Sequence, residues 1–222
     1  MEMGLGKTVV TLTAIDQLIY DRLEISRALI IAPKKVAEAT WQDEAEKWEH
    51  LQHLRISTVL GTEKQRKAAL EAPADIYIIN RENVPWLVHT LGRGWNFDMD
   101  EASSFKNHAA QRFKALKAVR PRIHKVVELT GTPRPNSLLD LWAQIYLLDQ
   151  GERLGRYITH YRQAYFWPTE YSYEPREGAA ETVESRIKDI VLSFKAADHL
   201  TLPEKITDDI PVVLDKPAGL SS

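Results

Sequence analysis

The chain opens with the stretch Met1-Glu2-Met3-Gly4-Leu5-Gly6-Lys7-Thr8, and this stretch decides the kind of fold that must follow it. Its glycines let the backbone turn tightly and approach a polyphosphate without a side chain in the way. The N–H groups of such a loop, with a helix N-terminus behind it, form an anion site. We expect Lys7 to contact the β- and γ-phosphates and the Thr8 hydroxyl to ligate Mg²⁺. The expected nucleotide-binding residues are Gly4, Leu5, Gly6, Lys7 and Thr8.

A helical pattern directly behind the loop strengthens this interpretation. Apolar side chains recur at helical spacing, at Val9, Val10, Leu12, Ala14, Ile15, Leu18 and Ile19. The common pattern G-x-x-x-x-G-K-[ST] has a glycine where Met1 stands, so the spacing departs from the pattern there. The structural alternative is a glycine turn that caps an ordinary helix, and the motif favours phosphate binding over it.

Composition indicates one domain with an extension, or two small domains. The chain has 222 residues, of which 44% are apolar, with a net charge of −2 and no cysteine. A net charge near zero gives no global attraction to nucleic acid, so DNA contacts need a local basic patch. The lack of cysteine excludes disulfides and thiolate metal sites. No apolar run approaches the ~18 residues of a membrane span. These features fit the cytosol, and we expect no membrane partner.

Short apolar runs alternate with helical patterns, which predicts an α/β fold. The expected strands are 28–32, 55–60, 75–79 and 125–130, with a short apolar stretch at 95–99. The expected helices are 7–20, 36–48, 62–71, 84–91, 107–119, 137–148 and 181–194. Strands that alternate with helices imply right-handed βαβ crossovers and a mainly parallel sheet flanked by helices. Residues 168–178 are expected to form an exposed loop, and 205–214 an edge strand.

An acidic pair, Asp100-Glu101, follows the short stretch at 95–99. In a phosphate-loop enzyme, a carboxylate at a neighbouring strand end holds Mg²⁺, and the next one can orient and deprotonate the attacking water. Parallel strands bring such groups to one edge of the sheet. We therefore expect Asp100 as a metal ligand and Glu101 as the base. Acids that merely favour a helix N-terminus are the structural alternative.

With Leu129-Thr130-Gly131-Thr132-Pro133, the chain resembles the first RecA-like lobe of Swi/Snf-type DNA-dependent ATPases, in helicase superfamily two. The other matching segments are 1–8 (motif I), 29–33 with Trp41, Glu44 and Trp48 (motif Ia), 78–82, 100–103 with 105–107 (motif II), and 202–205. Motif III consists of 129–133 with Asn136 and 139–142. The resemblance covers nearly the whole chain. Residues 103–107 and 173–175 are most similar to the small phage and prophage members, a likeness that implies a cytoplasmic protein of a bacterial or phage-infected cell.

The resemblance implies a P-loop ATP hydrolase that couples ATP hydrolysis to movement on double-stranded DNA, with ATP and Mg²⁺ as ligands. It implies catalytic roles for Lys7, Asp100 and Glu101. Residues that would couple hydrolysis to motion are Thr130, Gly131 and Thr132. The candidates for nucleic-acid contact are Pro33, Lys34, Lys35, Asn80 and Arg81. A module that binds nucleotide and nucleic acid without hydrolysis is the alternative.

The resemblance also implies a division of the chain. Residues 1–150 would form the ATP-binding lobe, 151–200 a helical extension, and 201–222 a lead-out toward a second RecA-like lobe that this chain lacks. The family has a strand before the loop and more aliphatic residues before Asp100. We therefore expect residues to be missing upstream of Met1 and between Met99 and Asp100. Because the family's arginine finger lies in the second lobe, we expect at most trace hydrolysis by these 222 residues alone.

Two further segments keep two interpretations each. The first holds six cations and no acid, namely Arg112, Lys114, Lys117, Arg120, Arg122 and Lys125. It either contacts phosphates or forms a solvated helix face. The second, 153–167, is rich in arginine and aromatic residues. It either stacks on bases or, as its helical spacing favours, packs as a helical protrusion. No histidine spacing indicates a zinc site.

Overall fold

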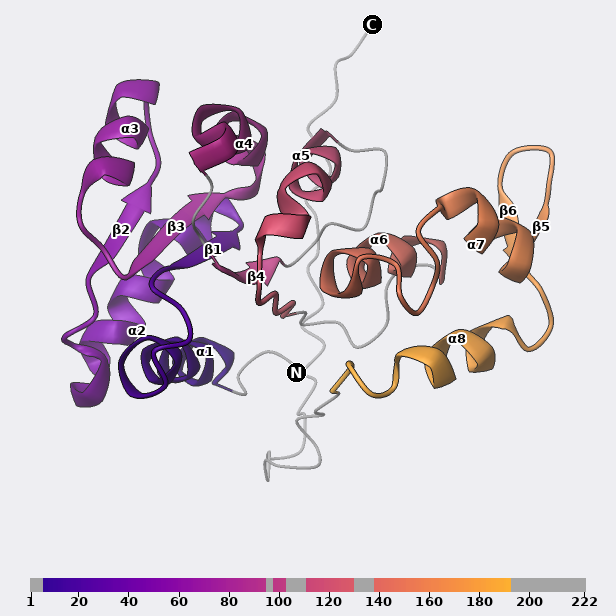
Figure 1. The fold of residues 1–222 in the computed structure, drawn as a ribbon, viewed down its shortest axis with the longest axis horizontal. Coiled ribbons are helices and arrows are strands. Elements are labelled where there is room, and N and C mark those ends of the chain that lie inside the picture. The colour runs from indigo at the N-terminus through magenta and orange to yellow at the C-terminus, as the bar shows by residue number, and fades with distance from the viewer. Residues whose placement is uncertain (1–5, 95–97, 103–110, 130–137, 193–222) are drawn as a thin grey trace, which may run out of the picture.

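The computed structural model describes residues 6–94, 98–102, 111–129 and 138–192, and Figure 1 shows their arrangement. The helices are α1 (Lys7–Asp16), α2 (Trp41–Lys47), α3 (Glu63–Glu71), α4 (Val84–Leu91), α5 (Gln111–Val119), α6 (Leu138–Asp149), α7 (Ile158–Tyr165) and α8 (Ala179–Ile187). The strands are β1 (Ala28–Ala32), β2 (Ile56–Val59), β3 (Ile76–Asn80), β4 (Asp98–Ala102), β5 (Phe166–Pro168) and β6 (Tyr173–Pro175).

Short turns of other helix types extend these elements. A π-helical turn, η1 (Gln17–Asp21), continues α1, and another, η2 (Val36–Thr40), precedes α2. The 3₁₀ turns η3 (Glu49–Leu51) and η6 (Arg120–Arg122) follow α2 and α5. No helix in the described ranges is long and apolar enough to cross a membrane.

The main sheet has four parallel strands in the order β2-β3-β1-β4. In its register, Ile30 of β1 lies between Ile78 of β3 and Asp100 of β4. Parallel neighbours need crossover connections, which the intervening helices supply. The predicted α/β fold with a mainly parallel sheet is confirmed, and the first three predicted strands lie within one residue of the observed ones.

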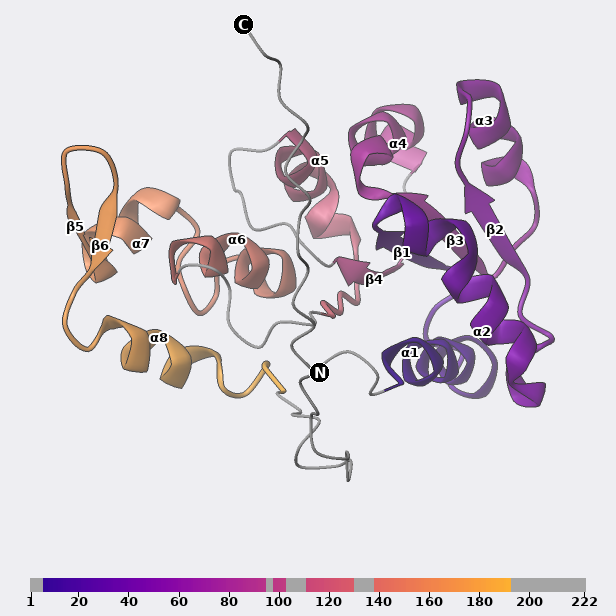
Figure 2. The same ribbon diagram turned by 180° about the vertical axis from the view of Figure 1, so that it is seen from behind.

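The central strands β1 and β3 are buried on both faces, as their uninterrupted apolar runs predict. On β1, Leu29 and Ile31 belong to a core shared with α4, α5 and α6. The alternate residues Ala28 and Ile30 belong to a second core shared with α1 and α2. Figures 1 and 2 show α1 and α2 on one side of the sheet and α4 and α5 on the other. Every residue of β1 is buried, so this strand anchors both layers.

Beyond the sheet, α6, α7 and α8 form a helical region that aromatic side chains hold together. Trp142 of α6 is buried, and its indole Nε1 donates to the Gly155 carbonyl at 2.9 Å. Tyr161 of α7 is buried, and its hydroxyl donates to the Leu138 carbonyl at 2.8 Å. These bonds fasten the connection after α6 and the start of α7 to α6 itself.

Two segments differ from the sequence-based expectation. The predicted loop 168–178 contains β6 and part of an antiparallel hairpin, in which Phe166 pairs with Pro175 and Pro168 with Tyr173. The predicted strand at 125–130 is not formed over its described part, which has only one isolated bridge, at Val126. A strand needs a continuous neighbour to satisfy its backbone groups, and Val127 is 48% exposed rather than buried in the sheet. The predicted edge strand 205–214 lies outside the described residues.

Candidate nucleotide and nucleic-acid site

The loop expected to bind phosphate leads directly into α1. Gly6 is the N-cap of this helix and adopts a left-handed backbone conformation, with φ 66° and ψ 27°. Glycine reaches this conformation without steric cost. Among the described residues, no side chain at the N-cap position bonds to the start of α1, and the first turn of the helix carries no acid. Within these residues the first N–H groups of the helix therefore have no N-cap side chain as acceptor, which suits an anion.

The helix behind Gly6 is held firmly against the sheet. Leu12 and Ile15 are buried in the core beneath it. Two histidines from the η3 region contact its outer polar side, since Nε2 of His50 lies 3.0 Å from Thr13 Oγ1 and Nε2 of His53 lies 2.8 Å from Asp16 Oδ1. The N-terminus of α1 is thus presented by a rigid support. Gly4 and Leu5 lie outside the described residues.

The acidic pair lies within β4, rather than after the end of the preceding strand. Asp100 pairs with Ile30, and Ala102 pairs with Ile31, so the register shifts and Glu101 is the extra residue on β4. Such irregularities are frequent beside active sites, where they redirect a strand. Asp100 therefore lies level with the middle of β1, and Glu101 lies one residue nearer the carboxyl end of the parallel sheet, the edge at which ligands bind in such folds. Their distance to Lys7 stays a prediction.

The carboxyl end of β1 carries the expected DNA-side residues Pro33, Lys34 and Lys35. The Pro33 carbonyl accepts hydrogen bonds from the N–H groups of Val36 and Ala37, both at 2.9 Å, which starts η2 directly after the strand. The Lys34 side chain is 71% exposed, with its ammonium 3.8 Å from Glu38. Lys35 is exposed as well. Two cations therefore lie beside the end of a central strand, where a phosphate can reach them.

A network of amides and a carboxylate fixes the turn after β3. Asn80 is buried, its Nδ2 donates to Glu82 Oε2 at 2.8 Å, and Asn83 Nδ2 donates to its Oδ1. The Glu82 backbone N–H, the Asn80 amide and the charges of Arg81 and Arg112 together hold the pKa of Glu82 below its usual range. Asn80 thus supports the turn that carries Arg81, and Arg81 is the more accessible of these two nucleic-acid candidates.

The basic segment 111–125 is mostly engaged in contacts within the protein. The Lys117 ammonium lies 4.5 Å from the Tyr146 ring centroid, and Arg122 Nη1 donates to the Gly92 carbonyl at 2.8 Å. Lys125 Nζ lies 2.6 Å from Glu24 Oε2. Arg120 is buried, and its guanidinium donates to the Ile123, Leu147 and Leu148 carbonyls. These contacts favour a structural role over a phosphate-binding face for the segment.

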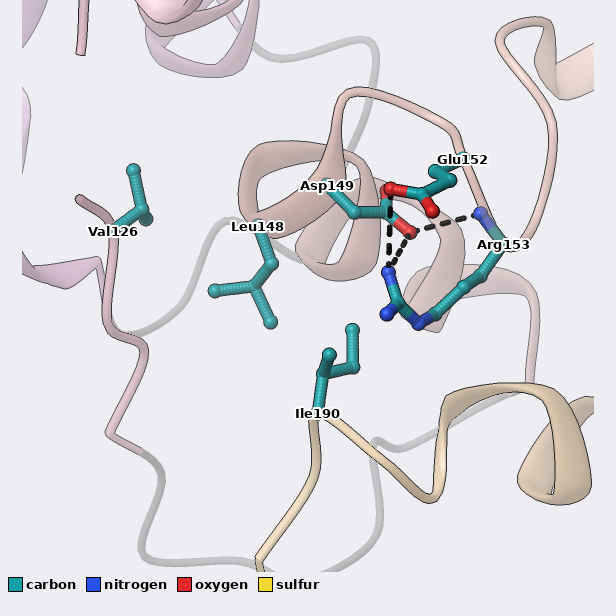
Figure 3. Close-up of a pocket in the computed structure, with 6 residues that line it drawn as sticks. All are labelled: Val126, Leu148, Asp149, Glu152, Arg153 and Ile190. Carbon is teal, nitrogen blue, oxygen red and sulfur yellow. Dashed lines mark hydrogen bonds and ion pairs between the residues drawn. The ribbon is translucent and has the colours of Figure 1, made fainter. Parts of the chain in front are cut away.

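Two hollows in the described structure are unsuited to phosphate. The first, of about 400 Å³, is lined by Val126, Leu148, Asp149, Glu152, Arg153 and Ile190. Figure 3 shows its arginine turned toward the carboxylates of Asp149 and Glu152, which lie 3.4 and 3.8 Å from the guanidinium. The guanidinium also lies 2.6 Å from the Asp189 carboxylate. The second, of about 290 Å³, lies along α1 and is lined by uncharged residues, Val9, Val10, Thr13, Ala14 and Gln17.

The sequence interpretation missed two features of this region. The sequence did not reveal that Arg120 caps the last turn of α6. An arginine in a basic run is expected to be solvated unless the fold places helix carbonyls around it. The amide network at Asn80 was missed because the sequence shows only a polar residue at a strand end. The residues Thr130, Gly131 and Thr132 lie outside the described ranges, so their coupling role remains a prediction.

Comparison with known proteins finds relatives of the kind that the sequence motifs predicted. A family model described as SNF2-related domain matches residues 1–214. Putative protein p41 of Acyrthosiphon pisum secondary endosymbiont phage 1 is 37% identical over 227 residues, which cover 96% of this chain and 49% of p41. Helicase ssl-1 of Caenorhabditis elegans is 32% identical over 154 residues, which cover 66% of this chain and 6% of that helicase.

A solved structure shares the fold. The Sulfolobus solfataricus SWI2/SNF2 ATPase core in complex with dsDNA superposes with a TM-score of 0.65 at 24% identity, covering 86% of this chain and 38% of that one. The chain spans about half the length of p41 and a smaller part of the other proteins. Because the family model matches nearly all of its residues, this chain belongs to the SNF2-related domain family of Swi/Snf helicase-like proteins.

Proposed function

We propose that this chain is the ATP-binding N-terminal lobe of a Swi/Snf-type translocase that couples ATP hydrolysis to movement on double-stranded DNA. The observation that carries the proposal is the left-handed Gly6 at the uncapped N-terminus of α1, with Lys7 and Thr8 in the first turn. That arrangement is what a bound polyphosphate requires. Its place on a parallel sheet, in a chain of this family, favours a motor over an unrelated anion site.

The proposed roles follow from the charge that each group carries. Lys7 contacts the terminal phosphates, and Glu101 accepts the proton of the attacking water. Thr8 and Asp100 hold Mg²⁺, for which hydroxyl and carboxylate oxygens are suitable ligands. The bound ion neutralises charge on the phosphates. The lack of an acid in the first turn of α1 fits this ligand set, because a carboxylate in that turn, without Mg²⁺ between it and the phosphates, would repel them.

The proposed DNA side lies beyond the carboxyl ends of β1 and β3. Lys34 and Lys35 follow β1, and Arg81 follows β3, its direct neighbour in the sheet. We propose that these cations contact the DNA backbone, which positions the duplex without reading its sequence. The proposal includes the division into the lobe 1–150, the helical extension 151–200 and the lead-out 201–222. It places motif III coupling at Thr130, Gly131 and Thr132, and the location in the cytoplasm.

The test is ATP hydrolysis in a longer protein that joins this chain to a second RecA-like lobe. We expect duplex DNA to stimulate its turnover, and added salt to reduce the stimulation because phosphate contacts are screened. Glu101→Gln should stop hydrolysis, since glutamine cannot accept the proton of the water. For residues 1–222 alone we expect trace turnover that DNA does not change, because an arginine finger contributes ~10³–10⁵ in rate.

A matched substitution separates catalysis from folding. Glu63→Gln removes an exposed carboxylate on α3, far along the chain from the proposed site, and should leave DNA-stimulated turnover unchanged. Near-normal turnover by Glu101→Gln would remove Glu101 from the role of base. Nucleotide binding without DNA-stimulated hydrolysis in the two-lobed protein would replace the motor by a nucleotide-dependent binding module.

A further inference from the structure

The aromatic run at 157–173 separates into buried anchors and displayed rings. Tyr161 and Phe166 are 1% and 2% exposed and belong to the core. Trp167 is 58% exposed and Tyr171 is 90% exposed, at the far end of the β5–β6 hairpin. Large aromatic side chains displayed on a folded surface are enriched in protein interfaces. The core does not require these two rings, so another role must be sought for them.

The hairpin holds the displayed rings in fixed positions. At its turn, the Thr169 N–H donates to the Ser172 carbonyl and the Ser172 N–H donates to Thr169 Oγ1, both at 3.0 Å. At its base, the Arg176 N–H donates to the Tyr165 carbonyl at 2.9 Å. The Arg176 guanidinium stacks on the Trp167 ring, 4.0 Å from its centroid. Rings that are already ordered lose little conformational entropy when a partner binds.

The charge around these rings selects the chemistry of the partner. From Phe166 to Glu184 the chain has five glutamates and one arginine, which gives a net charge of 1 − 5 = −4. The five glutamates, Glu170, Glu174, Glu177, Glu181 and Glu184, are all exposed. Glu174 pairs with Trp167 across the hairpin, so both side chains lie on the same face of it. Glu170 accepts a hydrogen bond from the Tyr171 hydroxyl at 3.0 Å.

Other modes of recognition fit this surface poorly. A net negative charge repels the DNA backbone, so the rings are not suited to nucleic acid. Addition of a partner strand is disfavoured, because β5 and β6 have three residues each and both end in proline. Recognition must therefore occur through side chains. Aromatic faces beside carboxylates attract ammonium and guanidinium groups, by cation–π contact and ion pairing together.

We propose that the hairpin face, defined as Trp167, Glu170, Tyr171 and Glu174, binds a lysine- or arginine-rich segment of a partner protein. The partner's cations would lie against the Tyr171 ring and between the two carboxylates. This surface is at the opposite end of the molecule from α1, α2 and the main sheet (Figures 1 and 2). The proposal is therefore independent of the proposed nucleotide site, and a partner could occupy the hairpin face while that site is in use.

The test uses the whole 222-residue chain and a fluorescein-labelled peptide of alternating lysine and serine, with fluorescence anisotropy as the readout. We expect saturable binding that weakens as salt is added. The triple variant Glu170→Gln, Tyr171→Ala and Glu174→Gln should bind roughly tenfold more weakly, since one exposed cation–π contact and two ion pairs are lost. All three side chains are exposed, so the variant should fold like the parent.

A control variant removes the same chemistry elsewhere. Glu49→Gln, Tyr157→Ala and Glu71→Gln also change two exposed carboxylates and one exposed ring and should leave the affinity within about twofold. The proposal is overturned if both triple variants lose affinity equally, which would indicate general attraction to an acidic protein. It is also overturned if the lysine peptide does not bind, or if a glutamate–serine peptide or duplex DNA binds the hairpin face instead.

Discussion

Replacing Arg120 by methionine should destabilise the fold by about 3 kcal/mol. Arg120 is 6% exposed, and its guanidinium donates to the Ile123, Leu147 and Leu148 carbonyls. Two of these carbonyls belong to the last turn of α6, which has no helical partners for them. Burial lowers the pKa of Arg120, yet its guanidinium remains charged at neutral pH. The residue therefore joins η6 to the end of α6 through charge-assisted bonds.

The magnitude follows from the three carbonyls that methionine would leave without a donor. Each unsatisfied buried group costs ~1–3 kcal/mol. We take the lower value, which gives about 3 kcal/mol for the three carbonyls, because water can reach a helix end and because the substitution also removes a buried charge. For a chain of this size, about 3 kcal/mol corresponds to a fall in Tm of roughly 6–12 °C. Circular dichroism during heating and during urea titration measures both quantities.

Arg122→Met is the matched control, because this arginine is exposed and, within the described part of the chain, donates one hydrogen bond, to the Gly92 carbonyl. It should cost no more than ~1 kcal/mol. If Arg120→Met and Arg122→Met lowered the free energy of unfolding equally, the assignment of Arg120 as the cap of α6 would be refuted.

Three further outcomes are expected. Gly151→Ala should cost more than the ~1–2 kcal/mol of left-handed strain, because a Cβ would lie 2.8 Å from backbone atoms of Arg156. Gly155→Ala, at the same φ of 87° with nothing within 4 Å, should cost only the strain, and equal urea midpoints would contradict this. For Asp75, burial would raise the pKa, but hydrogen bonds from Arg55 outweigh it and hold the pKa below 3.8. Its contribution to stability is therefore complete above that pH and is lost as the pH falls through the lowered pKa. Wild type and Asp75→Asn should differ most in unfolding free energy at neutral pH, and the difference should shrink as the pH falls below 3.8. Replacing Lys34 and Lys35 by glutamine should reduce the slope of log K against log salt, where K is the association constant for duplex DNA, by about 1.8. The same replacement at the exposed Lys64 and Lys67 of α3 should leave this slope unaltered. An unchanged slope for the Lys34 and Lys35 variant would exclude these two lysines from the DNA side.

The parallel sheet could be predicted from sequence because its strands are local and apolar. The two central strands are uninterrupted apolar runs except for Asn80 at the end of the second, and every residue in them is buried, namely Ala28–Ala32 and Ile76–Asn80. The expected helix at 84–91 agrees with α4, in which Pro85 lies in the first turn and Gly92 is the C-cap. In these segments the local preference of the residues for strand or helix agrees with the environment that the folded protein provides.

Features that depend on distant partners could not be predicted. The β5–β6 hairpin depends on side-chain hydrogen bonds at its turn, and its strands are too short to show alternation. The predicted strand at 125–130 contains apolar residues, but its formation depends on a neighbouring strand that sequence does not reveal. At the candidate site, the glycines of the loop and the apolar spacing behind them were sufficient to predict the loop and the helix that follows it. The register shift at Glu101 and the burial of Arg120 required the assembled fold.

The central claim is that the loop ending at Lys7 and Thr8 binds the phosphates of ATP. Equilibrium titration of the 222-residue chain with a fluorescent ATP analogue and Mg²⁺ tests it most directly. We predict that Lys7→Ala weakens binding at least tenfold, because a charge-assisted contact of ~1.5–3 kcal/mol is removed. Glu101→Gln should bind within about twofold of wild type, because its proposed role is proton transfer and not affinity. Equal affinity of Lys7→Ala and wild type for the nucleotide would contradict the account.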